Sequence, residues 1–267
     1  MRGRLHLPHP KQPSVMKMNE LFQNTFKAIG HELGHDRPRD LRPMWQRRLS
    51  AASVFCQSLV TCGYMTEEQM QRAALRYRLG MSRDGGVIFW QIDELDVLHD
   101  GKIMYYRQDC HRDHDRKPMW VNYLLRKNGL LPQDFKSEHC LFGLHLLSEK
   151  CRVKSEEFAT AIVESEKTAV IMSEVKPDYL WLATGGKTEL NVAKLRPLAG
   201  RKVILFPDTD ETGDTYREWY EVAEAATDVF GHPVTVSSIL EQRATKAQKA
   251  AKIDIVDMLF PHPKYGI

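Results

Sequence analysis

The last part of the chain alternates short apolar runs with helical patterns, and this alternation limits the folds that it can adopt. Four apolar runs have the length of strands: residues 159–163, 179–183, 202–206 and 234–236. Helical patterns follow them at residues 166–175, 191–195, 219–230 and 255–259. Strands that alternate with helices are typical of βαβ units and a parallel sheet. We therefore predict an α/β domain over residues 153–267, with helices on both faces of a parallel sheet.

Residues 66–152 show a different pattern, which predicts a smaller α+β region. Residues 66–69 read Thr-Glu-Glu-Gln, a capping box that should begin a helix ending near residue 75. Two β-rich runs, 87–92 and 102–107, follow turn signals at residues 84–86 and 100–101 respectively. Strands separated by Asp-Gly turns indicate an antiparallel meander.

The first 65 residues form a basic segment, which we expect to be helical after a disordered lead-in of about 15 residues. A short run within it would suit the phosphates and bases of nucleic acid: Arg37, Arg39, Arg42, Trp45, Arg47 and Arg48. A solvated helix start, anchored by the tryptophan, fits the same run.

Charge is distributed unevenly along the chain. Residues 1–150 carry 23 lysines and arginines against 17 acids, a net charge of +6. Residues 151–267 carry 15 against 18, a net charge of −3. A basic N-terminal part would suit binding to a polyanion, and an acidic C-terminal part would suit binding to metal ions. An uneven distribution of solvated surface charge explains the numbers equally well.

The composition is that of a folded protein with no membrane segment. Of the 267 residues, 42% are hydrophobic and 27% are charged, which favours packed domains over disorder. No stretch approaches the ~20 apolar residues of a membrane span, and the N-terminus lacks the apolar part of a secretory signal. The five cysteines are an odd number without a C-x-x-C pair, which indicates neither a disulfide framework nor a zinc ribbon. We expect a cytoplasmic protein with no membrane partner.

Polar residues follow three of the predicted parallel strands. Glu164 follows the first, Gly185 and Gly186 the second, and Asp208 and Asp210 the third. Ligands of open α/β sheets bind beyond the carboxyl ends of strands, where the strand order reverses. If the first and third strands are neighbours, in the order 2-1-3-4, Glu164 meets the aspartate pair there.

Such a cluster of acids predicts a cation site. Two carboxylates ~4 Å apart repel by roughly 4 kcal/mol at an effective dielectric constant near 20, so three would not all stay ionised alone. Oxygen ligands select a hard ion such as Mg²⁺, with Mn²⁺ as a substitute, and such a site serves phosphoryl or nucleotidyl transfer. Glu164 would then be the general acid or base. Four further residues are candidates for contacting phosphate or nucleotide: Lys167, Gly185, Gly186 and Gly213.

Each of these features also has a purely structural interpretation. An Asp-x-Asp loop often caps a helix, since aspartate is a preferred N-cap. A Gly-Gly pair often makes a tight turn, and a lysine in the first turn of a helix is often solvated.

Residues 163–169, 184–186 and 208–213 together resemble the Toprim domain, which bacterial primases, topoisomerases, some nucleases and primase-helicases share. Residues 252–259 are similar to the K-x-D-x-x-D-h-L segment that often closes such domains. The resemblance covers roughly residues 155–260 and is greatest to primase-like Toprim proteins of phages and bacterial mobile elements. The meander with residues 142–145 is similar to the region that precedes Toprim in uncharacterised proteins of such elements.

The resemblance implies a Rossmann-like sheet that holds Mg²⁺ through Asp208 and Asp210, with Glu164 as general acid or base. It implies a DNA primase-like nucleotidyltransferase of mobile-element replication, acting on single-stranded DNA with NTPs, beside a helicase or relaxase of the same element. The family usually has glycine where this chain has Ser165, so we expect an altered loop or altered activity. Without the zinc ribbon of primases, template recognition would come from the basic N-terminal part or from a partner.

Other functions are compatible with the same residues. A Toprim-type DNA nuclease would use the same acids, and a non-catalytic DNA-binding accessory protein would explain Ser165 as decay. A haloacid-dehalogenase-type phosphatase is disfavoured because only 57 residues follow Asp210. A topoisomerase is disfavoured because the chain is too short to supply a DNA-encircling domain with a nucleophilic tyrosine.

Overall fold

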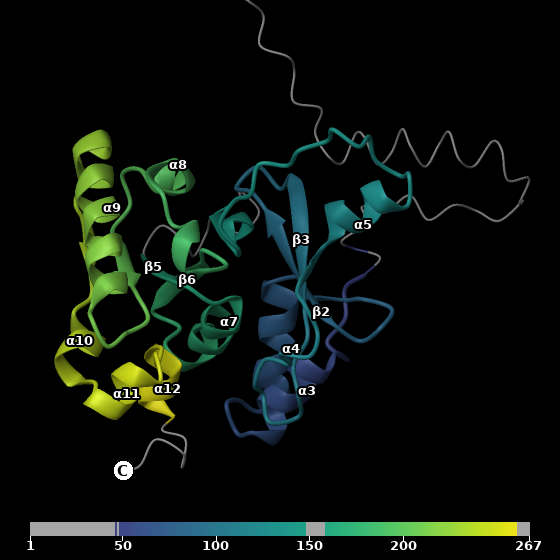
Figure 1. Ribbon diagram of the computed structural model, residues 1–267, viewed down its shortest axis with the longest axis horizontal. Coiled ribbons are helices and arrows are strands. Elements are labelled where there is room, and N and C mark those ends of the chain that lie inside the picture. Colours follow the sequence, from purple (N-terminus) through teal and green to yellow (C-terminus); the bar gives the residue numbers. More distant parts are fainter. Residues whose placement is uncertain (1–45, 47, 148–157, 261–267) are drawn as a thin grey trace, which may run out of the picture.

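The computed structural model describes residues 46, 48–147 and 158–260, which form two four-stranded sheets flanked by helices. One sheet is antiparallel, in the order β1-β2-β3-β4, and the other is parallel, in the order β6-β5-β7-β8. The two sheets lie side by side, with helices α3, α4 and α5 around the first and α7, α8 and α9 around the second (Figure 1). The predicted α/β class, with a smaller antiparallel region before a parallel sheet, is confirmed.

The antiparallel sheet forms from short strands with two helices before it and one after it. Its strands are β1 (Gly80–Met81), β2 (Val87–Ile92), β3 (Leu98–Met104) and β4 (Met119–Trp120). The helices are α3 (Val54–Thr61), α4 (Glu67–Arg76) and α5 (Val121–Lys127), and a 3₁₀ turn, η1, covers Leu144–Leu147. The predicted capping box at Thr66 is confirmed, since Thr66 Oγ1 accepts the N–H of Gln69 while the Gln69 side chain accepts the N–H of Thr66.

The turn predicted at residues 100–101 is wrong, because both residues lie within β3. The chain reverses instead at residues 93–97, where Asp93 Oδ1 accepts the N–H groups of Leu95 at 2.9 Å and Val97 at 2.8 Å. Gly101 lies opposite Trp90, and a Cβ there would come within 2.6 Å of the indole ring. The glycine therefore makes room for a buried tryptophan rather than a turn.

The parallel sheet has the strands and most of the helices that the sequence predicts. Its strands are β5 (Ala159–Val163), β6 (Tyr179–Ala183), β7 (Val203–Phe206) and β8 (Val234–Val236). Its helices are α7 (Glu166–Val175), α8 (Val192–Leu195), α9 (Asp214–Phe230), α10 (Ile239–Arg243), α11 (Lys246–Ala250) and α12 (Ile255–Leu259), with 3₁₀ turns η2 (Lys187–Glu189) and η3 (Arg196–Leu198). The order is 2-1-3-4 along the chain, so the ends of β5 and β7 are neighbours.

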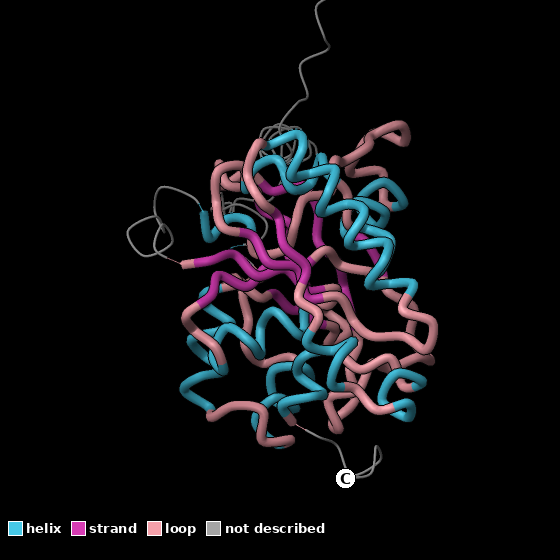
Figure 2. The backbone as a smooth tube through the Cα atoms, turned by 90° about the vertical axis from the view of Figure 1, so that its left-hand side faces the viewer, coloured by secondary structure: helices cyan, strands magenta, loops and turns pink. Residues whose placement is uncertain are grey.

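Alternate residues of the central strand serve two cores, as a strand covered on both faces requires. Ala161 and Val163 pack with α7 and α12, whereas Ile162 packs with Leu195 of α8 and Trp219 of α9. Figure 2 shows these helices on opposite sides of the strands.

The first of these cores also includes the antiparallel sheet. Phe89 of β2 and Phe142 belong to it together with Ala161 and Val163. Phe142 and Ala183 exchange backbone hydrogen bonds of 2.9 and 3.1 Å, and the Tyr77 hydroxyl donates to the carbonyl of Trp181 at 2.8 Å. The predicted regions 66–152 and 153–267 thus share apolar packing, and the boundary predicted between them lies outside the described residues.

Most of the N-terminal segment predicted over residues 1–65 also lies outside them, including its lead-in and Arg37, Arg39, Arg42, Trp45 and Arg47. Arg48 is described, and its carbonyl accepts the N–H of Met81 at 2.9 Å. Among the described helices, none has both the length and the apolar character needed to cross a membrane.

Candidate metal centre

Acidic residues from three separate parts of the chain converge beyond the carboxyl ends of β5 and β7. Val163 and Phe206 are paired at the ends of these strands, and Glu164 and Asp208 follow one and two residues later. The backbone N–H of Asp208 donates to the Glu164 carboxylate. A third segment joins them because the N–H of Thr209 donates to the carbonyl of Ile253 at 3.0 Å, which brings Asp254 alongside. The predicted meeting of strands at this edge is therefore present.

Glu164 is held in an environment that favours its protonated form. Its pKa rises from an ordinary value of 4.5 to about 7, mainly because burial disfavours the charged carboxylate. Lys187 and the N–H of Asp208 oppose this shift, while Asp254 and Asp210 add to it by charge repulsion. A carboxyl group with such a pKa can both accept and donate a proton near neutral pH.

Asp208 is only partly exposed, and one oxygen of its carboxylate is buried. Burial, and then the charges of Glu164 and Asp254, raise its pKa well above the usual range. Its Oδ1 atom is buried and has no hydrogen-bond partner within the described structure. A buried carboxylate oxygen without a donor is costly. A cation at this position would both satisfy that oxygen and offset the repulsion.

Asp210 has a different environment, although it is two residues away. Its carboxylate accepts five hydrogen bonds, from the N–H and hydroxyl groups of Thr212 and Thr215 and from the N–H of Asp214. Burial alone would raise its pKa, but the bonds from Thr215, Asp214 and Thr212 hold the pKa below its usual range. Asp210 thus fixes the start of α9, which is the helix-capping interpretation of the motif. Metal binding by Asp210 stays a prediction, and it would require some of these bonds to be released.

Two further acids, Asp254 and Asp257, belong to the cluster but were not among the predicted site residues. Asp254 caps α12 and accepts a short hydrogen bond from the Thr168 hydroxyl of α7. Lys167 is partly buried; burial alone would lower its pKa, but Asp254, Cys110 and Asp257 raise it. The predicted phosphate-binding lysine therefore lies among carboxylates. The K-x-D-x-x-D spacing was the signal for the two acids.

Lys187 is a third residue beside the cluster that was not among the predicted site residues, although it directly follows the Gly-Gly pair. Its Nζ lies 3.8 Å from Asp210 Oδ2 and 3.8 Å from Glu218 Oε2. Its side chain is 42% exposed, so the ammonium group can also meet a ligand at the edge of the cluster.

The predicted glycines shape the loops around these acids. Gly185 has a φ of +89°, its N–H donates to the carbonyl of Glu164 at 2.9 Å and its carbonyl accepts from Lys102 Nζ at 2.7 Å. Gly186 is extended, with a φ of 163°. Gly213 has a φ of +69° and is the N-cap of α9. The Gly186 N–H donates to Thr184 Oγ1 at 3.4 Å, so both glycine amides are engaged within the protein, and phosphate binding by either stays a prediction.

A loop or an activity altered by Ser165 stays a prediction, but the residue itself carries no backbone strain. Ser165 has a φ of −96° and a ψ of 137°, an extended conformation open to any residue. Its hydroxyl accepts the N–H of Lys167 at 3.2 Å, so Ser165 is the N-cap of α7. A glycine is not required at this position.

The donor set at this edge consists of carboxylate oxygens, which fit a hard divalent ion. Within residues 48–147 and 158–260, no set of three or more histidine, cysteine, aspartate or glutamate side chains is arranged to hold a metal ion. Because Asp210 already accepts five hydrogen bonds at the start of α9, Glu164 and Asp208 are the better placed of the three predicted carboxylates to hold an ion. Mg²⁺ commonly takes one or two carboxylates and completes its shell with water and substrate phosphates, so the pair suffices.

Fold and site together define an α/β protein with an acidic cluster at the carboxyl edge of its parallel sheet. Residues 53–209 match DUF6371, a domain of unknown function, and the chain belongs to that family. The matched segment includes Glu164, Gly185 and Asp208. No curated protein matches the chain.

Proposed function

We propose that this protein is a Mg²⁺-dependent enzyme of the Toprim type that acts on nucleic acid, with DNA primase-like nucleotidyl transfer as its activity. The observation that carries the proposal is the meeting of Glu164 and Asp208 at the ends of the two central strands, with Asp208 Oδ1 buried and unpartnered. Two partly buried carboxylates beside an exposed lysine are suited to binding a cation and a phosphate group.

The roles of the residues follow from their environments. Asp208 and Glu164 would hold Mg²⁺, or Mn²⁺ in its place, which when bound would orient phosphate oxygens and neutralise developing charge. Glu164, whose pKa is about 7 in the metal-free chain, would also be the general acid or base for the proton of the attacking hydroxyl. Lys187 would position a phosphate at the open side of the cluster.

The resemblance to mobile-element Toprim proteins supports single-stranded DNA and NTPs as substrates and a helicase or relaxase as partner. The exposed lysine at the edge of the cluster agrees with a triphosphate substrate. Lys187 supplies the cation that a triphosphate needs at a site otherwise dominated by acids.

A primer-synthesis assay tests the proposal. The full chain is incubated with a single-stranded template, labelled NTPs and Mg²⁺, and the products are resolved by length. Glu164→Gln and Asp208→Asn should each reduce primer yield by about 100-fold or more. Glu211→Gln is the matched control, since it removes an exposed acid from the same loop, and it should leave the yield unchanged.

The same preparation distinguishes the alternatives. Nicking of plasmid DNA without primers would identify a nuclease, and DNA binding without either product would identify an accessory protein. Primer synthesis that is undiminished in Asp208→Asn would contradict the proposed site.

A further inference from the structure

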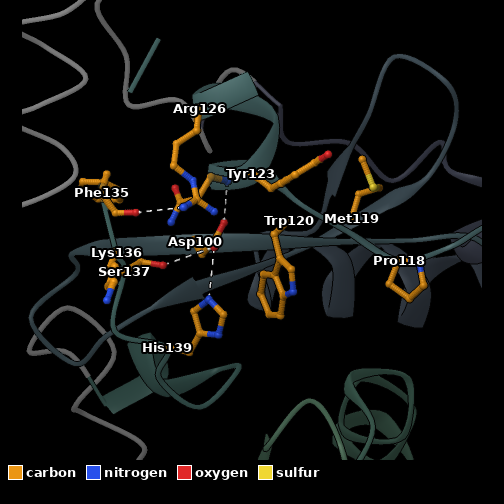
Figure 3. A pocket seen from close by; sticks show the side chains of 11 residues that line it. Asp100, Pro118, Met119, Trp120, Tyr123, Arg126, Phe135, Lys136, Ser137 and His139 are labelled. Carbon is orange, nitrogen blue, oxygen red and sulfur yellow. Dashed lines mark hydrogen bonds and ion pairs between the residues drawn. The ribbon is translucent and has the colours of Figure 1, made fainter. Parts of the chain in front are cut away.

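A second site lies on the antiparallel sheet, where β4, α5 and residues 132–139 enclose a cavity of about 550 Å³ (Figure 3). Its lining includes six polar or aromatic residues: Asp100, Trp120, Asn122, Arg126, Lys136 and His139. They come from three separate segments. None of them belongs to the acidic cluster.

Asp100 is the acid that lines this cavity, and both oxygens of its carboxylate are hydrogen-bonded within the protein. It is 2% exposed, and its Oδ1 accepts the N–H groups of Gly101 at 2.7 Å and Asn122 at 3.0 Å. Its Oδ2 lies 3.2 Å from His139 Nε2, as the dashed line in Figure 3 shows. Asp100 therefore holds together the three segments that line the cavity.

An aromatic surface lines another side of the cavity. Trp120 is partly exposed and stacks on His139, with ring centroids 4.1 Å apart and the planes inclined by 24°. Hydrogen bonding to Asp100 holds the imidazole in place behind the indole. A braced and accessible indole is a platform on which a flat ring can stack.

Two residues that line the cavity carry buried polar atoms without partners, and a third is an exposed cation. Asn122 is 4% exposed, and its Nδ2 donates to the carbonyl of His99 while its Oδ1 has no partner. Arg126 Nε is likewise buried without a partner. Lys136 is exposed, and it forms no ion pair with any residue that the structure describes. The lining of the cavity thus combines an aromatic ring with two basic residues, Lys136 and Arg126.

The cavity adjoins the turn that leads to the acidic cluster. Trp120 is paired with Lys102 across β3 and β4, so both side chains share one face of the sheet. Lys102 Nζ reaches the carbonyl of Gly185. Glu189, in the turn beyond Gly185, has its pKa lowered first by Lys194 and then also by His139 and Lys102.

We propose that this cavity binds a nucleotide, either free or as one unit of a single strand. The base would stack on Trp120, and the phosphate would meet Lys136 and Arg126. The choice of a nucleotide over other aromatic anions rests on the proposed function, whereas the existence of an aromatic, cation-bearing site rests on the geometry alone.

Binding to the full chain in EDTA tests this proposal without any metal-dependent step. The probes are AMP and a fluorescent single-stranded oligonucleotide. Trp120→Ala should raise the Kd for at least one probe by about tenfold or more, and Trp120→Phe by less, because it keeps part of the stacking surface. Lys136→Glu should also weaken binding, whereas Lys127→Glu, an exposed lysine of α5 outside the cavity, should not.

The two probes identify the source of the nucleotide. An effect on AMP indicates a site for free nucleotide, and an effect on the oligonucleotide alone indicates a strand-binding site; both support the proposal. Absence of binding by the wild-type protein, or equal binding by the correctly folded Trp120→Ala and Lys136→Glu variants, overturns it. Because EDTA removes every metal-dependent step, failure of the enzymatic proposal would leave this result unchanged.

Discussion

Lys102 and Glu166 form a buried ion pair that joins the two sheets of the protein. Lys102 Nζ, from β3, lies 3.0 Å from Glu166 Oε1 and 3.2 Å from Oε2 at the start of α7. Their side chains are 13% and 4% exposed. The same ammonium group donates to the carbonyl of Gly185, so one side chain ties the antiparallel sheet to a loop beside the acidic cluster.

Lys102→Met should lower the free energy of unfolding by about 3 kcal/mol, because it leaves the Glu166 carboxylate buried without its partner. Urea denaturation measures this change. The double variant Lys102→Met/Glu166→Gln should regain part of the loss, since the uncompensated charge is gone. Lys127→Met, at an exposed lysine, should change stability by less than about 0.5 kcal/mol. Equal losses in the single and double variants would contradict a charge-based role for the pair.

Asp208→Asn and Asp210→Asn should change stability in opposite directions in metal-free protein near pH 8. Asp210→Asn should cost about 2 kcal/mol, because an amide cannot accept all the hydrogen bonds that the carboxylate receives. Asp208→Asn should be neutral or stabilising, because it removes a carboxylate whose pKa is raised by burial and by Glu164. Thermal unfolding in EDTA compares the two, and similar losses in both variants would refute the division of roles.

The sequence predicted the parallel sheet well because each strand there is a continuous apolar run between polar segments. Residues 159–163, 179–183 and 234–236 match β5, β6 and β8. The antiparallel sheet was harder, since Gly101 has the appearance of a turn residue when its packing against Trp90 is not known. Local patterns do not show which distant ring a glycine accommodates.

The candidate site was predictable to the extent that strand order decides it. Glu164 and Asp208 meet because β5 and β7 are neighbours, as the order 2-1-3-4 requires. The different roles of Asp208, which has an unpartnered oxygen, and Asp210, which caps α9, were not predictable. They depend on which carboxylate turns toward the N–H groups of α9. The contact between Lys102 and the Gly185 carbonyl depends on how the two sheets pack, which no local motif encodes.

Gly185→Ala should destabilise the protein by about 1–2 kcal/mol, whereas Gly186→Ala should cost less than about 0.5 kcal/mol. Gly185 has a φ of +89°, and a Cβ there would lie 3.1 Å from Glu166 Oε1. Gly186 is extended, and its nearest contact would be an ordinary 3.5 Å to Glu189 Cγ. Urea denaturation of both variants measures the difference, and equal effects would show that the Gly185 conformation is not needed.

Glu164 should make the metal-free protein less stable as the pH rises from about 4.5 to about 7. The folded state raises the pKa of Glu164, so it binds the proton more tightly than the unfolded chain does. That stabilisation is complete at lower pH and is lost as the group ionises. Glu164→Gln should reduce the fall in unfolding free energy by on the order of 2 kcal/mol. An identical pH dependence in the variant would show that Glu164 titrates normally.

Calorimetric titration of Mg²⁺ into the metal-free chain tests most directly whether Glu164 and Asp208 share a divalent ion. The wild-type protein should bind Mg²⁺ saturably, and Glu164→Gln and Asp208→Asn should each raise the Kd by about tenfold or more. Glu211→Gln should bind Mg²⁺ like the wild type. Absence of Mg²⁺ binding by the wild-type protein, or equal affinity in all four proteins, would contradict a shared divalent ion.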